Sequence, residues 1–191
     1  MSALLLLAAL ALSEPTTAAA PPLATVQADR PTRSGYVQGT LNLAAGERVV
    51  LRPTGDGEFE LVEARFVGLE AALPPQPGTR PDMTTLFAAQ PGTIAISLGM
   101  QAGVGSFLKI ENRLDGSFSY IGLIVGWRDG RPTEPGRTTV CTVSKDKLGF
   151  EHWETPIVQV VMGNLQVLPD APPVCETEES IRESVTPRPT T

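Results

Sequence analysis

The sequence predicts an all-β protein, an antiparallel β-sandwich of the immunoglobulin-like or jelly-roll-like kind, with a small closed β-barrel as the alternative. Three observations predict it. Short runs in which apolar and polar residues alternate recur along the chain, which is typical of strands with one buried face. Turns rich in Gly and Pro separate these runs, and the chain contains 18 of each residue. After the first twelve residues, helix-forming residues dominate no stretch of the chain.

The first part of the domain contains four predicted strands. We expect them at residues 35–43, 48–52, 58–69 and 93–98. Val49 and Leu51 point to one face of the second strand, and Ile94 and Ile96 share one face of the fourth. Pro53 ends the second strand, because proline has no backbone N–H to donate to a neighbouring strand.

The third of these strands should be irregular. Residues 55–57, Gly-Asp-Gly, precede it and are typical of a hairpin turn. At the start of the strand the odd-numbered positions, beginning with Phe59, are the apolar ones that should point inward. Farther along, the even-numbered positions such as Ala64 fit the inward face better. A change of parity inside a strand requires an extra residue, and we predict a β-bulge near residues 62–63.

The strongest strand signal lies in residues 107–127. Two strand-like runs flank Asp115-Gly116, a dipeptide that favours the tight type I′ turn of a β-hairpin. The first run alternates apolar and polar residues, whereas residues 120–127 are apolar on both faces. Such a strand usually lies in the middle of a sheet or turns one face to a partner. We therefore predict a hairpin whose two arms pair with each other.

The last part of the domain contains a third turn and two more strands. The turn is predicted at residues 128–132, and the strands at 137–143 and 157–168. Gly163-Asn164 interrupts the last strand and predicts a bulge or a change of sheet. Residues 145–155 are polar, and we interpret them as a surface loop.

Two further loops are rich in proline or glycine. In residues 73–92, Asp82 is a candidate N-cap for a short turn, and we expect Met83, Leu86 and Phe87 to plug one open end of the sandwich. A lid over a ligand and simple disorder are the alternatives. Residues 99–105 contain three glycines without a following Lys-Ser or Lys-Thr, so they predict a flexible turn and not a phosphate loop.

Four regions are predicted along the chain. They are a signal peptide at 1–20 with cleavage between 13 and 20, an extended linker at 21–33, the β-sandwich domain at 34–175 and a disordered polar tail at 176–191. The apolar run that begins the chain is too short to span a bilayer, and no later run is long enough. We expect an exported protein, periplasmic or secreted, with no membrane span after removal of the signal.

The charge of the chain argues against two classes of partner. Its net charge is −6, and its Lys and Arg residues form no cluster. Nucleic acids and anionic lipid surfaces both need several convergent cations. We therefore expect that the chain does not bind nucleic acid and that its partner is an unknown protein or small molecule of the cell envelope. A homodimer is a further possibility that the sequence leaves open.

Cys141 and Cys175 are the two cysteines of the chain, and we predict that they form a disulfide. An exported protein favours the bond, and its position before the polar tail suggests that it clamps the end of the last strand to the sheet. A redox pair would need closely spaced cysteines and a helix N-terminus to lower their pKa values.

Ser97 is a candidate nucleophile. Residues 95–99 approach the nucleophile-elbow pattern, and Asp129 or Asp146 and then His152 follow in the order of an α/β-hydrolase triad. The mechanism needs a helix directly after the serine, and the glycines at 99–105 do not favour one. A hydrolase that uses Ser97 and His152 is therefore a remote alternative.

Glu151, His152 and Trp153 form the densest polar cluster, together with Glu154. One histidine with flanking carboxylates could bind a metal or transfer a proton. A structural metal site needs three or four ligands, and the chain contains one histidine. We predict no metal and no cofactor, and interpret the cluster as a surface loop whose Trp153 packs against the sheet.

Tyr120 and Trp127 are candidates for an aromatic binding platform, although aromatic residues on strands lie more often in the core. Together with the 151–153 cluster they form the candidate ligand or partner surface. The leading functional hypothesis is an exported, non-enzymatic interaction or accessory module. The alternative is a carrier that holds a small ligand between the sheets or under residues 73–92.

Overall fold

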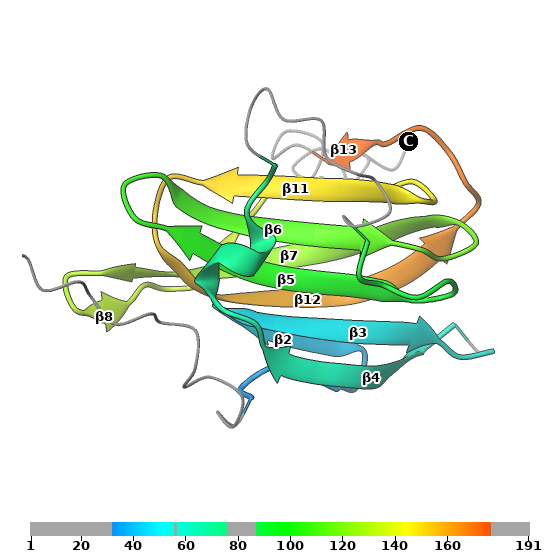
Figure 1. Cartoon of the computed structure of the whole chain (residues 1–191), viewed down its shortest axis with the longest axis horizontal. Helices are drawn as coiled ribbons and strands as arrows, with labels where there is room; N and C mark the ends of the chain where they lie inside the picture. Colours follow the sequence, from blue (N-terminus) through cyan, green and yellow to red (C-terminus); the bar gives the residue numbers. More distant parts are fainter. Residues whose placement is uncertain (1–31, 56, 76–86, 177–191) are drawn as a thin grey trace, which may run out of the picture.

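Two antiparallel sheets pack against each other, and one of them is strongly curled (Figure 1). The structure is a computed structural model that describes residues 32–55, 57–75 and 87–176. Strands account for 59 % and helix for 3 % of the described residues. The predicted all-β sandwich is therefore confirmed. The predicted signal peptide, most of the linker and the tail beyond residue 176 lie outside the described residues.

The six-stranded sheet lies at the back of Figure 1. Its members are β1 (Gly35–Val37), β2 (Thr40–Ala44), β7 (Ser117–Arg128), β8 (Arg131–Pro132), β9 (Gly136–Arg137) and β12 (Ile157–Leu168). They follow the order β1-β2-β12-β7-β8, and β9 also pairs with β7. The long strands β7 and β12 pair along most of their length, so the stretch that is apolar on both faces lies inside the sheet, as predicted.

The five-stranded sheet lies at the front and has the order β11-β6-β5-β3-β4. Its members are β3 (Glu47–Pro53), β4 (Phe59–Phe66), β5 (Ile94–Gln101), β6 (Gly105–Asn112) and β11 (Lys147–Trp153). A separate pair, β10 (Val140–Cys141) and β13 (Cys175–Glu176), contacts β7 through β10. One short 3-10 helix, η1 (Leu69–Ala72), packs on β5.

The core lies between the two sheets and contains the predicted inward residues. Val49, Leu51, Ile94 and Ile96 are each 0 % exposed. Phe118 lies at the centre, with ring centroids 6.1 Å from Phe59 and 5.6 Å from Tyr120. The alternation in the sequence therefore assigned the buried face of the main strands correctly.

Both predicted bulges are present. The pairing of β3 with β4 skips Val62, because Val50 pairs with Glu63 and Leu51 with Leu61. The pairing of β12 with β7 shifts after Gly163, next to Asn164, whose φ is 49°. The β3–β4 hairpin and the turn between β7 and β8 also form as predicted.

The predicted hairpin at Asp115-Gly116 is wrong. Strands β6 and β7 belong to different sheets, and residues 113–116 carry the chain from one sheet to the other. Neither Asp115 nor Gly116 has the positive φ that a type I′ turn requires. Gly116 instead allows a close approach, because a Cβ there would lie 2.2 Å from the Leu168 carbonyl oxygen.

Other predicted elements also differ from the structure. The predicted strand 137–143 forms only the short strands β9 and β10 and an isolated bridge at Val143. The first predicted strand divides into β1 and β2 at a turn with positive φ at Gln38 and Gly39. Strand β5 continues through Gly99 to Gln101. Glycine fits at position 99 because η1 packs against it, and a Cβ there would lie 2.2 Å from the Leu69 carbonyl oxygen. Residues 147–153 form strand β11 and not a surface loop. Their polar character arises because one side of this edge strand faces solvent.

The predicted plug in residues 73–92 is only partly described. Met83 and Leu86 lie outside the described residues. The ring of Phe87 lies 5.2 Å from the guanidinium of Arg113, and the amides of Ala88 and Ala89 donate to the buried carboxylate of Glu111. This part of the segment therefore binds to the outer face of the five-stranded sheet.

Candidate functional site

A groove lies where the chain passes from the six-stranded to the five-stranded sheet. Residues 140–143 run beside β7, with a bridge between Val143 and Phe118, and β11 then pairs with β6. The two segments are consecutive arms that turn at Asp146, whose φ is 53°. Because each arm pairs with a different sheet, the arms separate and leave space between them.

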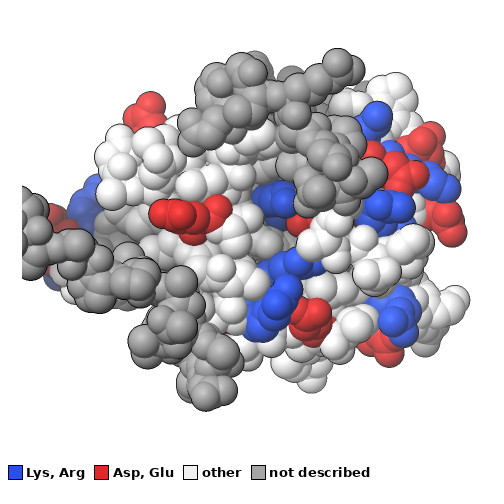
Figure 2. All heavy atoms as spheres, viewed as in Figure 1, with Lys and Arg blue, Asp and Glu red and all other residues white. Residues whose placement is uncertain are grey.

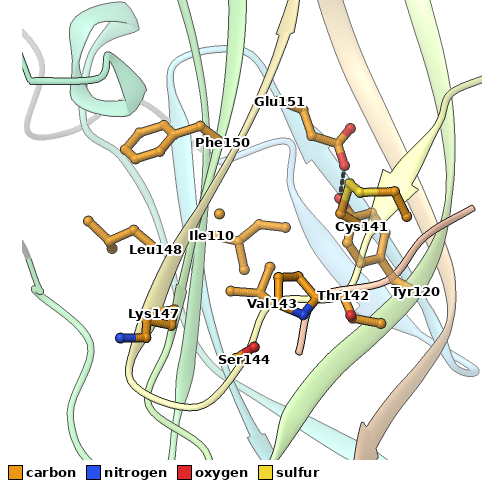
Figure 3. A pocket seen from close by; sticks show the side chains of 13 residues that line it. Ile110, Tyr120, Cys141, Thr142, Val143, Ser144, Lys147, Leu148, Phe150 and Glu151 are labelled. Carbon is orange, nitrogen blue, oxygen red and sulfur yellow. Dashed lines mark hydrogen bonds between the residues drawn. A yellow bond between two sulfur atoms is a disulfide. The ribbon is translucent and has the colours of Figure 1, made fainter. Parts of the chain in front are cut away.

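The groove has a volume of about 380 Å³ and is lined largely by apolar groups (Figure 3). One wall is β11 from Lys147 to Glu151, and the other is residues 141–144 with Pro173 and Cys175. Ile110 and Tyr120 line the groove between these two walls. Gly149 brings the arms together, because Val143 Cγ2 lies 2.6 Å from where a Cβ would be. A larger residue at 149 would push the arms apart.

A carboxyl and a phenol meet at one end of the groove. The hydroxyl of Tyr120, on β7, donates a hydrogen bond to Oε1 of Glu151, on β11 (Figure 3). The contact joins the two sheets at the edge of the sandwich. Oε2 of Glu151 is buried and has no hydrogen-bond partner among the described residues. A buried carboxylate without a counter-charge is unfavourable, so this environment favours the protonated acid.

The titration of both groups reflects this burial. Burial raises the pKa of Glu151 from 4.5 to about 7, against the opposing effects of the hydrogen bond from Tyr120 and of the Cys141 amide. Burial also raises the pKa of Tyr120 well above its ordinary value, and the neighbouring Glu151 raises it further. Near neutral pH the end of the groove therefore holds a neutral phenol and a carboxyl close to its titration midpoint.

We expect Glu151 to make the fold less stable as pH rises. The pKa of Glu151 is higher in the folded than in the unfolded chain, so the folded state binds the proton more tightly, and protonation stabilises it. That contribution is full below pH 4.5, decreases as pH rises from 4.5 towards 7, and is gone above 7. At about 1.4 kcal/mol per pKa unit, and allowing for partial solvent access, the loss between pH 5 and pH 8 is about 2 kcal/mol.

Urea unfolding of the wild type and of Glu151→Gln at these two pH values measures the effect. Gln keeps the shape and cannot ionise, so the wild type should lose about 2 kcal/mol more than the variant. Glu154→Gln, at an exposed neighbouring position, is the control and should follow the wild type. Equal pH dependence in all three proteins would show that Glu151 is ionised at no cost in the fold.

The structure separates the members of the predicted 151–153 cluster. Glu151 and Trp153 point inward, and Nε1 of Trp153 donates to Oγ1 of Thr138 at 2.9 Å. His152 points outward and is exposed; its ring stacks on Phe107 with centroids 4.7 Å apart, and its Nε2 lies 3.1 Å from the Val104 carbonyl oxygen. No cluster of three potential metal ligands occurs in the part of the chain that the structure describes.

Tyr120 and Trp127 do not form one platform. Tyr120 is 3 % exposed and lies under the groove, whereas Trp127 is 45 % exposed near the other end of the same strand. Trp127 lines a separate shallow hollow of about 310 Å³ with Thr133 and Glu134. Of the predicted surface residues, the structure therefore brings together Tyr120 and Glu151 only.

The residues of the hydrolase alternative are not assembled. Ser97 lies inside β5 on the outer face of the sheet and is 3 % exposed. Within the described residues it makes no hydrogen bond to His152. Asp146 forms an ion pair with Arg113 at 2.9 Å, and Asp129 lies in the β7–β8 turn. The position inside a strand also removes the strand-to-helix turn that a nucleophile elbow requires.

The predicted disulfide between Cys141 and Cys175 is present, with the sulfur atoms 2.05 Å apart. It joins β10 to β13 and forms part of the groove wall. Cys141 also borders a second hollow of about 230 Å³, on the side of Ser117 and Pro169. The disulfide is compatible with an exported protein.

Charges are dispersed over the face of the five-stranded sheet (Figure 2). Lys and Arg side chains alternate there with Asp and Glu, and ion pairs join Arg52 to Glu60 and Lys109 to Glu111. Comparison with protein-family models, with curated proteins and with solved structures found no match. Among the described residues, no helix has both the length and the apolar character of a membrane span.

Sequence reasoning missed the groove and the contact between Tyr120 and Glu151. The two residues are 31 positions apart and come from different sheets. One signal was available. Glu151 occupies an inward position if residues 147–153 are a strand, and an inward carboxyl in an otherwise apolar sandwich indicates a functional or hydrogen-bonded group.

Proposed function

We propose that this protein is an exported, non-enzymatic binding module whose ligand occupies the groove between β11 and residues 141–144. One observation carries the proposal. The groove is open and largely apolar, yet a buried carboxyl with an oxygen that lacks a hydrogen-bond partner lies at its end. Binding sites combine these features, a mostly apolar concave wall and a few fixed polar groups.

Export is part of the proposal. A disulfide that forms a wall of the groove needs an oxidising compartment to persist, which favours the periplasm or the exterior of the cell. The apolar run at the start of the chain supports the same assignment. The absence of catalysis is proposed because the sequence-predicted residues Ser97 and His152 do not meet, and Glu151 has a phenol as its partner and not a nucleophile.

A neutral apolar dye tests the groove. N-phenyl-1-naphthylamine fluoresces more strongly when it leaves water, and we expect saturable binding to the wild type. Leu148→Trp fills part of one wall and should weaken binding at least fivefold. Leu61→Trp is the matched control, because Leu61 is a similar leucine on the opposite edge strand of the same sheet and should leave binding unchanged.

Two results would contradict the proposal. The first is no saturable binding to the wild type, which would mean that the groove accepts no apolar guest. The second is equal binding to both tryptophan variants and the wild type, which would place the dye elsewhere on the protein.

A small-ligand carrier is the second candidate function. The volume of about 380 Å³ lies within the range of small-molecule sites, which supports it. The groove lies beside β11, and none of the described residues of the 73–92 segment, where the sequence placed the alternative site, lines it. Retention of an organic-soluble compound by protein purified from its native compartment, detected by mass spectrometry, would favour this candidate.

A further inference from the structure

Strand β11 is an edge strand with one unpaired side. It pairs with β6 along its whole length, from Lys147 opposite Asn112 to Trp153 opposite Ser106. Its other side pairs with none of the described strands. In an antiparallel pair, alternate residues direct their N–H and C=O groups away from the partner. β11 therefore presents a row of backbone donors and acceptors along its outer side.

That unpaired side faces the groove. Five consecutive residues of β11, from Lys147 to Glu151, line it. Successive side chains of a strand point to opposite faces, so side chains alone would line a cavity only at every second position. Contact with five in a row means that the groove runs along the backbone edge. Figure 3 shows Leu148 and Phe150 on one side of this edge and Glu151 on the other.

We propose that the ligand of this groove is an extended peptide segment of a partner protein, which adds to β11 as a further strand of the five-stranded sheet. The inference rests on the proposed function and names the class of its ligand. Backbone hydrogen bonds to the outer side of β11 would hold such a peptide, and side-chain contacts would select it. A compact small molecule would leave most of these backbone groups without a partner.

The walls define the side chains that the peptide would carry. Its residues facing the core would meet Ile110, Tyr120 and Val143, which are all buried, and those facing outward would lie beside Leu148 and Phe150. Phe150 is 37 % exposed, so an added strand would also cover an apolar surface. Alternating apolar residues fit both faces. A carboxylate would be disfavoured at the end beside Glu151, because this end of the groove is buried and favours neutral groups.

The chain offers a suitable probe, a labelled peptide with the sequence of β6, Gly105–Asn112. This sequence already pairs with β11 in a defined register on the opposite side, with apolar residues facing the core. Two derivatives carry N-methyl groups on alternate residues, one on the even and one on the odd positions. N-methylation removes the N–H donor and leaves the side chain, so it isolates the contribution of backbone pairing.

We expect the unmodified peptide to bind the full chain, as measured by fluorescence anisotropy. One methylated peptide should bind at least tenfold more weakly and the other within about threefold of the unmodified peptide, because an added strand uses one set of amides against β11. Amide hydrogen exchange should slow in β11 on binding. It should not change in β4, the opposite edge strand of the same sheet.

Three results would overturn the inference. If both methylated peptides bind like the unmodified one, side chains alone are recognised. If the dye binds and no peptide does, the groove takes a small molecule and the proposed function stands without the inference. If β11 is protected without peptide in a concentration-dependent dimer, the strand that adds to it comes from a second copy of this chain. Failure of the dye as well would remove the proposed function itself.

Discussion

Replacing Asn112 with alanine should lower the free energy of unfolding by about 3–5 kcal/mol. Asn112 is 0 % exposed at the corner where the chain changes sheets. Its Nδ2 donates to the carbonyl oxygens of Gly116 at 2.8 Å and Val143 at 2.7 Å. Its Oδ1 accepts from the amide of Leu114 at 2.9 Å. Alanine would remove the partner of the buried Gly116 carbonyl and of the Leu114 amide, and each loss costs about 1–3 kcal/mol. The Val143 carbonyl would lose one of two hydrogen bonds and would still accept from the Phe118 amide at 2.8 Å.

Urea unfolding at constant pH measures this loss. Asn42→Ala is the matched control, because Asn42 is half-buried on β2 and makes one hydrogen bond, from Gln159 at 3.2 Å. We expect the control to lose no more than about 1 kcal/mol. A loss of similar size in both variants would mean that the corner does not depend on the asparagine side chain.

Removal of the disulfide should cost about 3–4 kcal/mol. Cys141 and Cys175 are 34 positions apart, and their bond limits the freedom of that loop in the unfolded chain. The double variant Cys141→Ser, Cys175→Ser should therefore unfold at a lower urea concentration. Because the bond forms part of the groove wall, dye binding should weaken in the same variant.

A reducing agent provides the control for this prediction. It should destabilise the wild type by about the same amount and leave the double variant unchanged, since the variant has no bond to reduce. A wild type that is insensitive to reductant under unfolding conditions, or a double variant as stable as the wild type, would contradict the assigned contribution of the disulfide.

Much of the fold could be predicted from the sequence. Alternation placed Val49, Leu51, Ile94 and Ile96 in the core, and a change of parity located the bulge at Val62. These features depend on neighbouring residues of one strand, and the period of two reports them directly. The disulfide was also predictable, because the chain contains two cysteines.

The assignment of strands to sheets was not predictable in the same way. Asp115-Gly116 is typical of a hairpin, yet β6 and β7 belong to different sheets. A dipeptide determines only which backbone conformations are locally favourable. Which strands pair also depends on contacts made much later in the chain, here the carbonyl group of Val143 that Asn112 binds and the Leu168 backbone that approaches Gly116.

The sequence by itself predicted an all-β protein with one disulfide and assigned the buried face of most strands, but it left a closed barrel open beside the sandwich. The tertiary structure alone decided where the candidate site lies. Glu151 meets Tyr120, and β11 separates from residues 141–144, because two consecutive segments pair with different sheets. Alternation along a strand records which side is buried, but it contains no information about which distant strand lies next to it.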